Sequence, residues 1–188
     1  MFVEKLGIDL MTLDGGKVYG PRGIGCLFVR RGIVLAPIIV GGGQENGIRS
    51  GTENLPAIAG FARALEIASQ ERVKEIVRIS GIRALCVEEL HRVNSSIVVT
   101  GSYDEAQSPH ILNISIPSID IEFFLFQLDA QGIACSTKSS CLRDEDESYV
   151  LKAVGANSKT SLRFSFGRWT KKGDIKTMIR AIRDLLSH

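Results

Sequence analysis

Two apolar segments separated by a glycine-rich turn stand at the start of the chain, and they constrain its fold more than any other feature. Residues 6–13 and 24–30 have the length and composition of short strands. The second segment is apolar enough to be buried on both faces. A domain seldom opens on a core strand unless other strands flank it. We therefore expect these strands to form the edge of a larger sheet, most of which this chain lacks.

The rest of the chain changes from helical to alternating hydrophobic periodicity. Apolar stripes predict a first helix that starts near Pro56 and a second over residues 70–93, which Gly81 weakens. Beyond them we expect strands at residues 96–101, 110–116, 133–136 and 161–166, and helices at 121–131, 148–154 and 172–186. The sequence thus predicts an α/β chain in two parts, with part of a large domain over residues 1–69 and a small α+β domain over residues 70–188.

The bulk composition is typical of a soluble globular protein. Of the 188 residues, 44% are hydrophobic, and the formal net charge of +2 is too small to imply a nucleic-acid or membrane partner. No apolar run approaches the roughly 18 residues that span a bilayer, and the first residues mix acids and bases where a secretion signal is apolar. The four cysteines include no CxxC pair, so neither zinc nor disulfides are expected, and the expected location is cytoplasmic.

Lys17 lies in the glycine-rich turn between the two predicted strands. A loop at the end of sheet strands is a common position for a ligand. A partly desolvated lysine loses its proton readily and can form a Schiff base. The alternative is a solvated loop lysine without a special function, and spacing alone leaves both interpretations open.

Cys141 follows a small polar stretch between a predicted strand and a predicted helix. A reactive thiol needs exposure and a nearby positive charge that stabilises the thiolate. Lys138 can supply that charge, while the acidic run over residues 144–147 opposes it. The alternative is an inert loop thiol. The other three cysteines lie on apolar elements and are predicted to be packing residues: Cys26, Cys86 and Cys135.

Two further segments offer groups that bind anions. Arg163 lies in a predicted apolar strand, and because a buried unpaired charge is costly, it needs either a ligand carboxylate or a structural ion pair. The loop over residues 49–52 offers backbone amides, the Thr52 hydroxyl and a following helix start, which together suit a phosphate. Glycine-rich helix starts are common, so this loop does not define a site by itself.

Together, four passages resemble the aminotransferase class V family, and within it the NifS/IscS-like cysteine desulfurases. They resemble the cofactor-lysine loop, the RSGT loop, the active-cysteine loop and the substrate-arginine strand of that family. Their order and spacing extend over nearly the whole chain. In that order, the passages are residues 9–25, 42–54, 132–141 together with 148–151, and 162–168.

The resemblance implies a fold, a cofactor and roles for single residues. The fold would be the end of a pyridoxal-phosphate fold type I large domain followed by the small C-terminal domain. Lys17 would hold pyridoxal 5′-phosphate as a Schiff base, Arg163 would bind the carboxylate of L-cysteine, and Cys141 would take the substrate sulfur as a persulfide. Thr52 would bind the cofactor phosphate of a neighbouring subunit, which implies a homodimer. A sulfur-acceptor protein, in iron–sulfur cluster assembly or tRNA thiolation, would be a further partner.

The chain also departs from the family pattern. Asp14 and Gly16 stand where members usually carry a serine and a histidine that help to bind the cofactor phosphate. A carboxylate at Asp14 would repel a phosphate unless it is turned away or paired. Further cofactor-binding residues of the family would precede Met1, so the chain is expected to be a C-terminal half that needs an N-terminal half. The alternatives are a non-enzymatic dimerisation or interaction fragment, a decayed paralogue, and a selenocysteine lyase.

Overall fold

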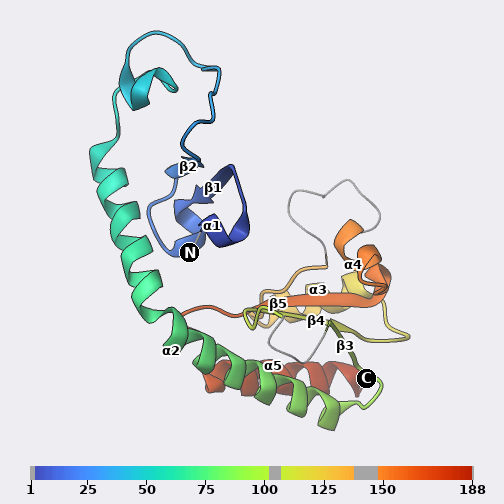
Figure 1. Ribbon diagram of the computed structural model, residues 1–188. Coiled ribbons are helices and arrows are strands. Elements are labelled where there is room, and N and C mark those ends of the chain that lie inside the picture. The colour runs from blue at the N-terminus through green and yellow to red at the C-terminus, as the bar shows by residue number, and fades with distance from the viewer. Residues whose placement is uncertain (1–2, 102–106, 138–147, 188) are drawn as a thin grey trace. The chain divides into compact units, whose positions relative to one another are not determined.

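The computed structural model describes residues 3–101, 107–137 and 148–187 (Figure 1). The chain divides into two compact units, Met1–Arg72 and Val73–His188. The division falls inside one long helix, α2 (Leu55–Val93), and the boundary predicted near Ser69 falls in the same helix.

The first unit begins with a short helix and an antiparallel pair of strands. Helix α1 (Val3–Leu6) ends at Gly7, whose φ of 63° favours glycine. Strand β1 (Leu10–Asp14) then pairs with β2 (Gly25–Val29) over its whole length. The strand predicted over residues 6–13 therefore starts later than expected, because its first residues form the end of the helix and a turn.

The prediction that these two strands are buried is wrong for the described structure. Leu10 and Leu27 each leave 46% of their surface exposed, and Cys26, predicted to pack in a core, is exposed as well. The reason is that a ribbon of two strands is only partly covered: Met11 and Leu13 of β1 are half-buried, whereas Leu10 and Leu27 remain exposed. Among the described residues of this unit, the buried ones are Gly15, Ser50 and Phe61.

A single helix replaces the two helices that the sequence predicts. Helix α2 is continuous over Leu55–Val93. The residues at the expected break, 68–72, are all compatible with a helix, and Gly81 costs only about 1 kcal/mol relative to alanine. Asn54 caps the start of α2, because its Oδ1 accepts a hydrogen bond from the Ala57 amide at 3.2 Å.

The second unit is built on a three-stranded antiparallel sheet in the order β3–β4–β5. The strand predicted over residues 133–136 does not form, because only its last residue, Ser136, forms a bridge to β5, at Arg163. The other three strands lie where the alternating pattern predicts them, and a 3-10 turn, η4, leads into the last one. Their bounds are β3 (Val98–Thr100), β4 (Ile111–Ser115), η4 (Ser158–Thr160) and β5 (Ser161–Ser165).

Three helices complete the second unit. Helix α3 (Ile121–Ala130) is capped by the carboxylate of Asp120, and α4 (Tyr149–Ala153) by the hydroxyl of Ser148. Helix α5 spans Lys172–Leu186, the range that the sequence predicts, and lies beside the second half of α2 (Figure 1). Among the described helices, none is both long and apolar enough to cross a membrane.

One contiguous hydrophobic core fills this second unit. It combines buried side chains from α2, α3 and α5 with the buried faces of β4 and β5. Leu112 and Leu162, on neighbouring strands, have no exposed surface, and Cys86 of α2 packs among them as predicted. The second unit therefore contains the buried apolar surface that the first unit lacks.

Arg78 of α2 holds the segment that follows β5. Its guanidinium donates hydrogen bonds to the carbonyl oxygens of Gly167 (2.9 Å) and Thr170 (2.6 Å). It also pairs with Glu75 at 2.6 Å, and this hydrogen bond from Arg78 keeps the pKa of the Glu75 carboxyl below its ordinary value. The end of β5 is thus fixed to the helix beside it.

Candidate functional site

Lys17 lies on a capped turn of the first unit, η1 (Gly15–Val18), between β1 and β2. The Asp14 carboxylate caps this turn, since its Oδ1 accepts a hydrogen bond from the Gly16 amide at 2.7 Å. Glycine is required at position 15, where a Cβ would lie 2.7 Å from a backbone carbonyl oxygen. The Lys17 side chain is exposed, so the turn presents its amine to solvent from a fixed backbone.

A second glycine-rich loop of the first unit, residues 41–52, is held together by two hydrogen bonds within the loop. The buried Ser50 hydroxyl donates to the Gly42 carbonyl oxygen at 2.8 Å. The Gly51 amide donates to the side chain of the first residue of η2 (Gln44–Gly47) at 3.2 Å. Thr52 follows, exposed and three residues before α2 begins. Because a helix start carries free amides and a partial positive charge, Thr52 lies where an anion can bind.

Arg163 lies in the middle of β5, half-buried and directly opposite Asn113 of β4. Its Nε atom is buried and has no hydrogen-bond partner among the described residues. No carboxylate in the described part of the chain forms an ion pair with its guanidinium. The guanidinium therefore retains capacity to bind an anionic ligand.

The segment that leads to Cys141 begins beside Arg163. The Arg163 amide donates a hydrogen bond to the Ser136 carbonyl oxygen at 2.7 Å, and the Ser136 amide donates to the Arg163 carbonyl oxygen at 3.1 Å. Cys141 itself lies outside the described residues, together with the rest of residues 138–147. The bridge thus fixes the point from which the chain leads into that segment.

Two other cysteines of the second unit are unsuited to nucleophilic chemistry. Complete burial raises the pKa of the Cys86 thiol to about 12. Burial, together with the Asp129 carboxylate, raises the pKa of the Cys135 thiol to about 11. Since the thiolate is the reactive form, both thiols are inert near neutral pH. Both act as packing residues, as the sequence predicts.

The site residues that the sequence singles out fall into two groups. Lys17 and Thr52 belong to the first unit, whereas Arg163 and the start of the Cys141 segment belong to the second. Sequence reasoning did not single out Asn113. Its only signal is a polar residue inside an apolar strand, and the strand register that sets it opposite Arg163 cannot be read from the sequence.

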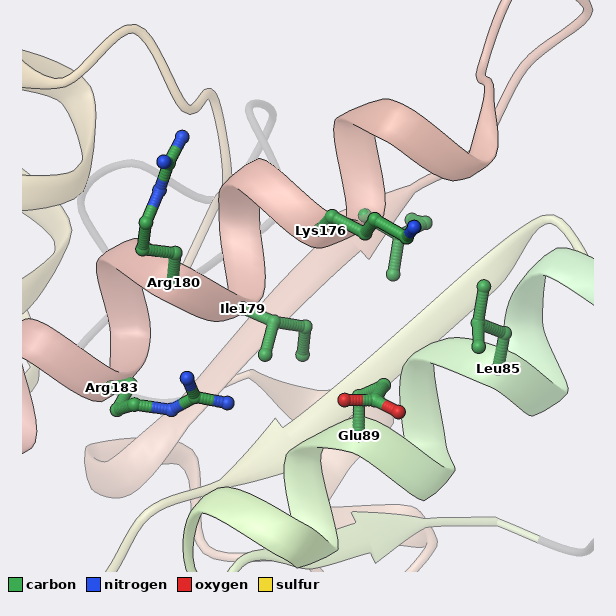
Figure 2. A pocket seen from close by; sticks show the side chains of 7 residues that line it. Leu85, Glu89, Lys176, Ile179, Arg180 and Arg183 are labelled. Atoms are coloured by element: carbon green, nitrogen blue, oxygen red, sulfur yellow. The ribbon is translucent and has the colours of Figure 1, made fainter.

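A shallow groove of about 280 Å³ lies between α2 and α5 in the second unit (Figure 2). Its apolar side chains are Leu85, Ile175 and Ile179, and Figure 2 shows Glu89 on α2 and the arginines of α5 around them. Among the described residues, none of those that the sequence singles out (Lys17, Thr52 and Arg163) lines this groove. The remaining lining residues are Lys176, Arg180 and Arg183.

The fold is similar to solved structures of NifS-like proteins. One NifS-like protein is 30% identical, with a TM-score of 0.86, over 98% of this chain and 48% of the other. The NifS-like protein from Rickettsia africae is 27% identical, with a TM-score of 0.85, over 100% of this chain and 50% of the other. These likenesses confirm the predicted fold class, a mixed helix and sheet chain that forms part of fold type I.

The sequence comparisons agree with the structural ones. The family model "Aminotransferase class-V" matches residues 1–178, and the chain belongs to this family. Cysteine desulfurase IscS 1 of Archaeoglobus fulgidus is 35% identical over 184 residues, which is 96% of this chain and 48% of the relative. Cysteine desulfurase IscS of Pseudomonas entomophila is 41% identical over 179 residues, 92% of this chain and 43% of the relative. The chain therefore spans about half the length of the curated relatives it matches.

Proposed function

We propose that this chain is part of a pyridoxal-phosphate-dependent cysteine desulfurase, which removes sulfur from L-cysteine and leaves alanine. The observation that carries the proposal is the bridge between Ser136 and Arg163. It joins an arginine that has no described anionic partner to the start of the segment that carries Cys141. Desulfuration of an amino acid needs both a carboxylate-binding group and a sulfur nucleophile, and the second unit supplies them together.

The residues of the first unit fit the cofactor at two points. The Lys17 amine is exposed on its capped turn, and it would hold the aldehyde carbon of pyridoxal phosphate. The exposed Thr52 hydroxyl, before the start of α2, suits a phosphate. Asp14 fits less well, since a carboxylate repels a phosphate, but its Oδ1 is turned to the Gly16 amide, which spreads its charge into the turn. We infer that Thr52 of a second copy completes the phosphate site.

Each site residue has a task in the proposed reaction. Bound pyridoxal phosphate would supply the electron sink for the substrate. Arg163 holds the substrate carboxylate through two hydrogen bonds, and Lys17 moves protons at the substrate carbon atoms. The Cys141 thiolate attacks the substrate sulfur, so that an S–S bond forms and the carbon–sulfur bond breaks. The electron pair of the broken bond stays with the carbon, which takes a proton and becomes the methyl group of alanine.

We further propose that the complete site needs an N-terminal half, a second copy of the chain and a sulfur-acceptor protein. The length of the relatives supports the first of these, because the chain covers 48% of the Archaeoglobus fulgidus enzyme. The exposed apolar side chains of β1 and β2, such as Leu10 and Leu27, support it as well. They offer the surface on which further strands of a sheet can pack.

The test is assembly with the missing part. The chain is produced together with the N-terminal half of the Archaeoglobus fulgidus relative, and assembly is verified by gel filtration. We expect the wild-type assembly to bind pyridoxal phosphate with visible absorbance and to form alanine from L-cysteine. Lys17→Ala is expected to assemble without colour or activity, while Lys159→Ala, a control lysine outside the site, keeps both. An assembled wild-type protein that stays colourless with excess cofactor would refute the proposal.

One observation favours a second candidate, a non-enzymatic interaction fragment. Asp14 places a carboxylate in the turn that would otherwise face a phosphate, and the Gly16 amide already bonds to it. In that case the chain would dimerise or bind a partner without cofactor. Labelling of the assembled protein for persulfides after addition of L-cysteine separates the two candidates, since the interaction fragment would remain unlabelled.

A further inference from the structure

A row of polar side chains crosses the sheet of the second unit. Thr100, Asn113, Arg163 and Ser136 lie directly opposite one another on β3, β4, β5 and the bridged segment. Directly opposed residues of antiparallel strands point to the same side of the sheet, with Cβ atoms about 4.5–5.5 Å apart. These four residues, here called the polar row, are all half-buried.

Two atoms of the polar row are complementary, and neither has a partner in the part of the chain that the structure describes. Among these residues, Asn113 Oδ1 is a buried acceptor without a hydrogen bond, and Arg163 Nε is a buried donor without one. Leaving such a buried group without a hydrogen bond is unfavourable, because the group has lost its bonds to water. The two residues are opposite each other in the β4–β5 register, so their side chains are neighbours on one face of the sheet.

We propose that Asn113 is a positioning residue for carboxylate binding by Arg163. When a carboxylate arrives, the Asn113 amide oxygen accepts the Nε–H of Arg163. The two Nη groups then remain for the ligand, so the carboxylate binds at the end of the guanidinium fork and not along its Nε side. The inference rests on the proposed function, in which Arg163 binds the carboxylate of L-cysteine.

An amide suits this position better than a carboxylate does. Asparagine can accept the Nε–H and leave the full positive charge of Arg163 for the ligand. An aspartate at position 113 would accept the same hydrogen bond but would pair with the guanidinium and compete with the ligand. Asn113→Ala removes the hydrogen bond that orients the Arg163 guanidinium, whereas Asn113→Asp keeps that bond and neutralises the charge of the guanidinium. The two variants therefore separate the effect of orientation from the effect of charge.

The experiment measures carboxylate binding on the chain itself, without cofactor or turnover. The ¹⁵N-labelled chain is titrated with L-alanine, and the Arg163 Nε–H resonance, assigned by its absence in Arg163→Lys, is followed by NMR. L-alaninamide, which lacks the carboxylate, is the control ligand. In the wild-type chain we expect L-alanine, but not L-alaninamide, to shift the resonance.

The variants give the decisive readings. We expect Asn113→Ala to weaken L-alanine binding roughly tenfold, as for the loss of one hydrogen bond to a charged group. Asn113→Asp should keep the Nε–H bonded but abolish L-alanine binding. Thr100→Ala, in the same polar row but not beside Arg163, should bind L-alanine as the wild type does. The amide resonance of Leu162, in the core, reports whether each variant is folded.

Two results overturn the inference: no L-alanine binding by the wild-type chain, or unchanged binding by a folded Asn113→Ala chain. Either result leaves the proposed desulfurase activity to be judged by the assembled protein. Conversely, an assembled protein that forms no alanine would refute the proposed function. It would not affect a measured binding of carboxylate at Arg163 or the dependence of that binding on Asn113. The two proposals therefore fail by different measurements.

Discussion

The two units of the chain differ in how far each one buries its own apolar residues. In the second unit, Leu112 and Leu162 on neighbouring strands are completely buried in a core that three helices help to form. In the first unit, the strand residues Leu10 and Leu27 are 46% exposed. The second unit contains a contiguous core of its own, whereas the strands of the first have the composition of a core but are only partly covered in the described structure.

The same difference separates the two groups of site residues. Lys17 and Thr52 of the first unit lie on exposed loops whose backbones are fixed by local hydrogen bonds. Arg163 of the second unit is half-buried in a packed sheet. Recognition of a carboxylate can therefore be built into the second unit by itself, while a cofactor site in the first unit depends on whatever covers its strands.

The largest expected effect tests this contrast in stability. Leu162→Ala should lower the free energy of unfolding of the chain by about 2–5 kcal/mol, because it opens a cavity in the core. Leu27→Ala should change it by less than about 0.5 kcal/mol, because the exposed Leu27 side chain makes few packing contacts that the substitution can remove. Urea unfolding of the isolated chain measures both. Equal losses for the two variants would contradict the difference between the units.

Assembly with an N-terminal half gives a second test of the difference between Leu27 and Leu162. If further strands cover β2, Leu27→Ala should become costly in the assembled protein, as in other cores, while the cost of Leu162→Ala stays the same. Gel filtration at several concentrations gives the ratio of assembled to free chain, and this ratio measures how much each variant weakens assembly. A Leu27→Ala chain that assembles as well as the wild type would show that β2 is not covered.

The next effect concerns the turn that carries Lys17. Replacing Asp14 by serine and Gly16 by histidine removes a negative charge and adds donors, so the assembled protein should bind pyridoxal phosphate at least roughly tenfold more tightly. Glu4→Gln, which removes an exposed carboxylate of α1 in the same unit, is the control. Absorbance titration with the cofactor measures the dissociation constants, and unchanged affinity in the double variant would show that Asp14 does not oppose the phosphate.

The smallest expected effect is a pH dependence within the second unit. The hydrogen bond from Arg78 lowers the pKa of Glu75 from its ordinary value of 4.5, so its stabilising effect is present above that value. It is lost as the pH falls through the lower pKa of the folded state. Glu75 and Arg78 are 26% and 34% exposed, so the pair contributes at most about 1 kcal/mol.

Urea midpoints of the wild type and Glu75→Gln, measured from pH 7 to pH 3, test this dependence. We expect the wild type to be the more stable protein at pH 7, and the difference to vanish well below pH 4.5. Glu66→Gln is the matched control, because its pair with Arg63 lies on an exposed part of the same helix. A difference between wild type and Glu75→Gln that persists at pH 3 would rule out ionisation of Glu75 as its cause.

The sequence predicts the second unit better than the first, for a physical reason. The limits of α5 and the positions of β4 and β5 follow from hydrophobic periodicity, because the core that selects those residues is present in this chain. The apolar residues of β1 and β2 predict burial that the described structure does not contain. The continuous α2 was missed because no residue near Ser69 forbids a helix, and absence of a breaker is a weak signal.

For the candidate site, too, the sequence predicts only part of what the structure contains. Motifs predict Lys17, Thr52, Arg163 and Cys141 as site residues, and these assignments remain predictions. The hydrogen bond from the Gly16 amide shows that one oxygen of the Asp14 carboxylate is turned into its own turn, but a neutral amide leaves the negative charge in place. Asn113 could not be predicted, because its relation to Arg163 depends on strand register and not on sequence distance.

The central claim is that the second unit carries both carboxylate recognition and the sulfur nucleophile. Its most direct test is mass spectrometry of the assembled protein after incubation with L-cysteine. We expect one added sulfur atom on the peptide that contains Cys141 and none on Cys135, whose raised pKa keeps its thiol protonated. Cys141→Ser should form no persulfide and should still bind L-alanine. A persulfide on Cys135, or alanine formed by Cys141→Ser at the wild-type rate, would contradict the claim.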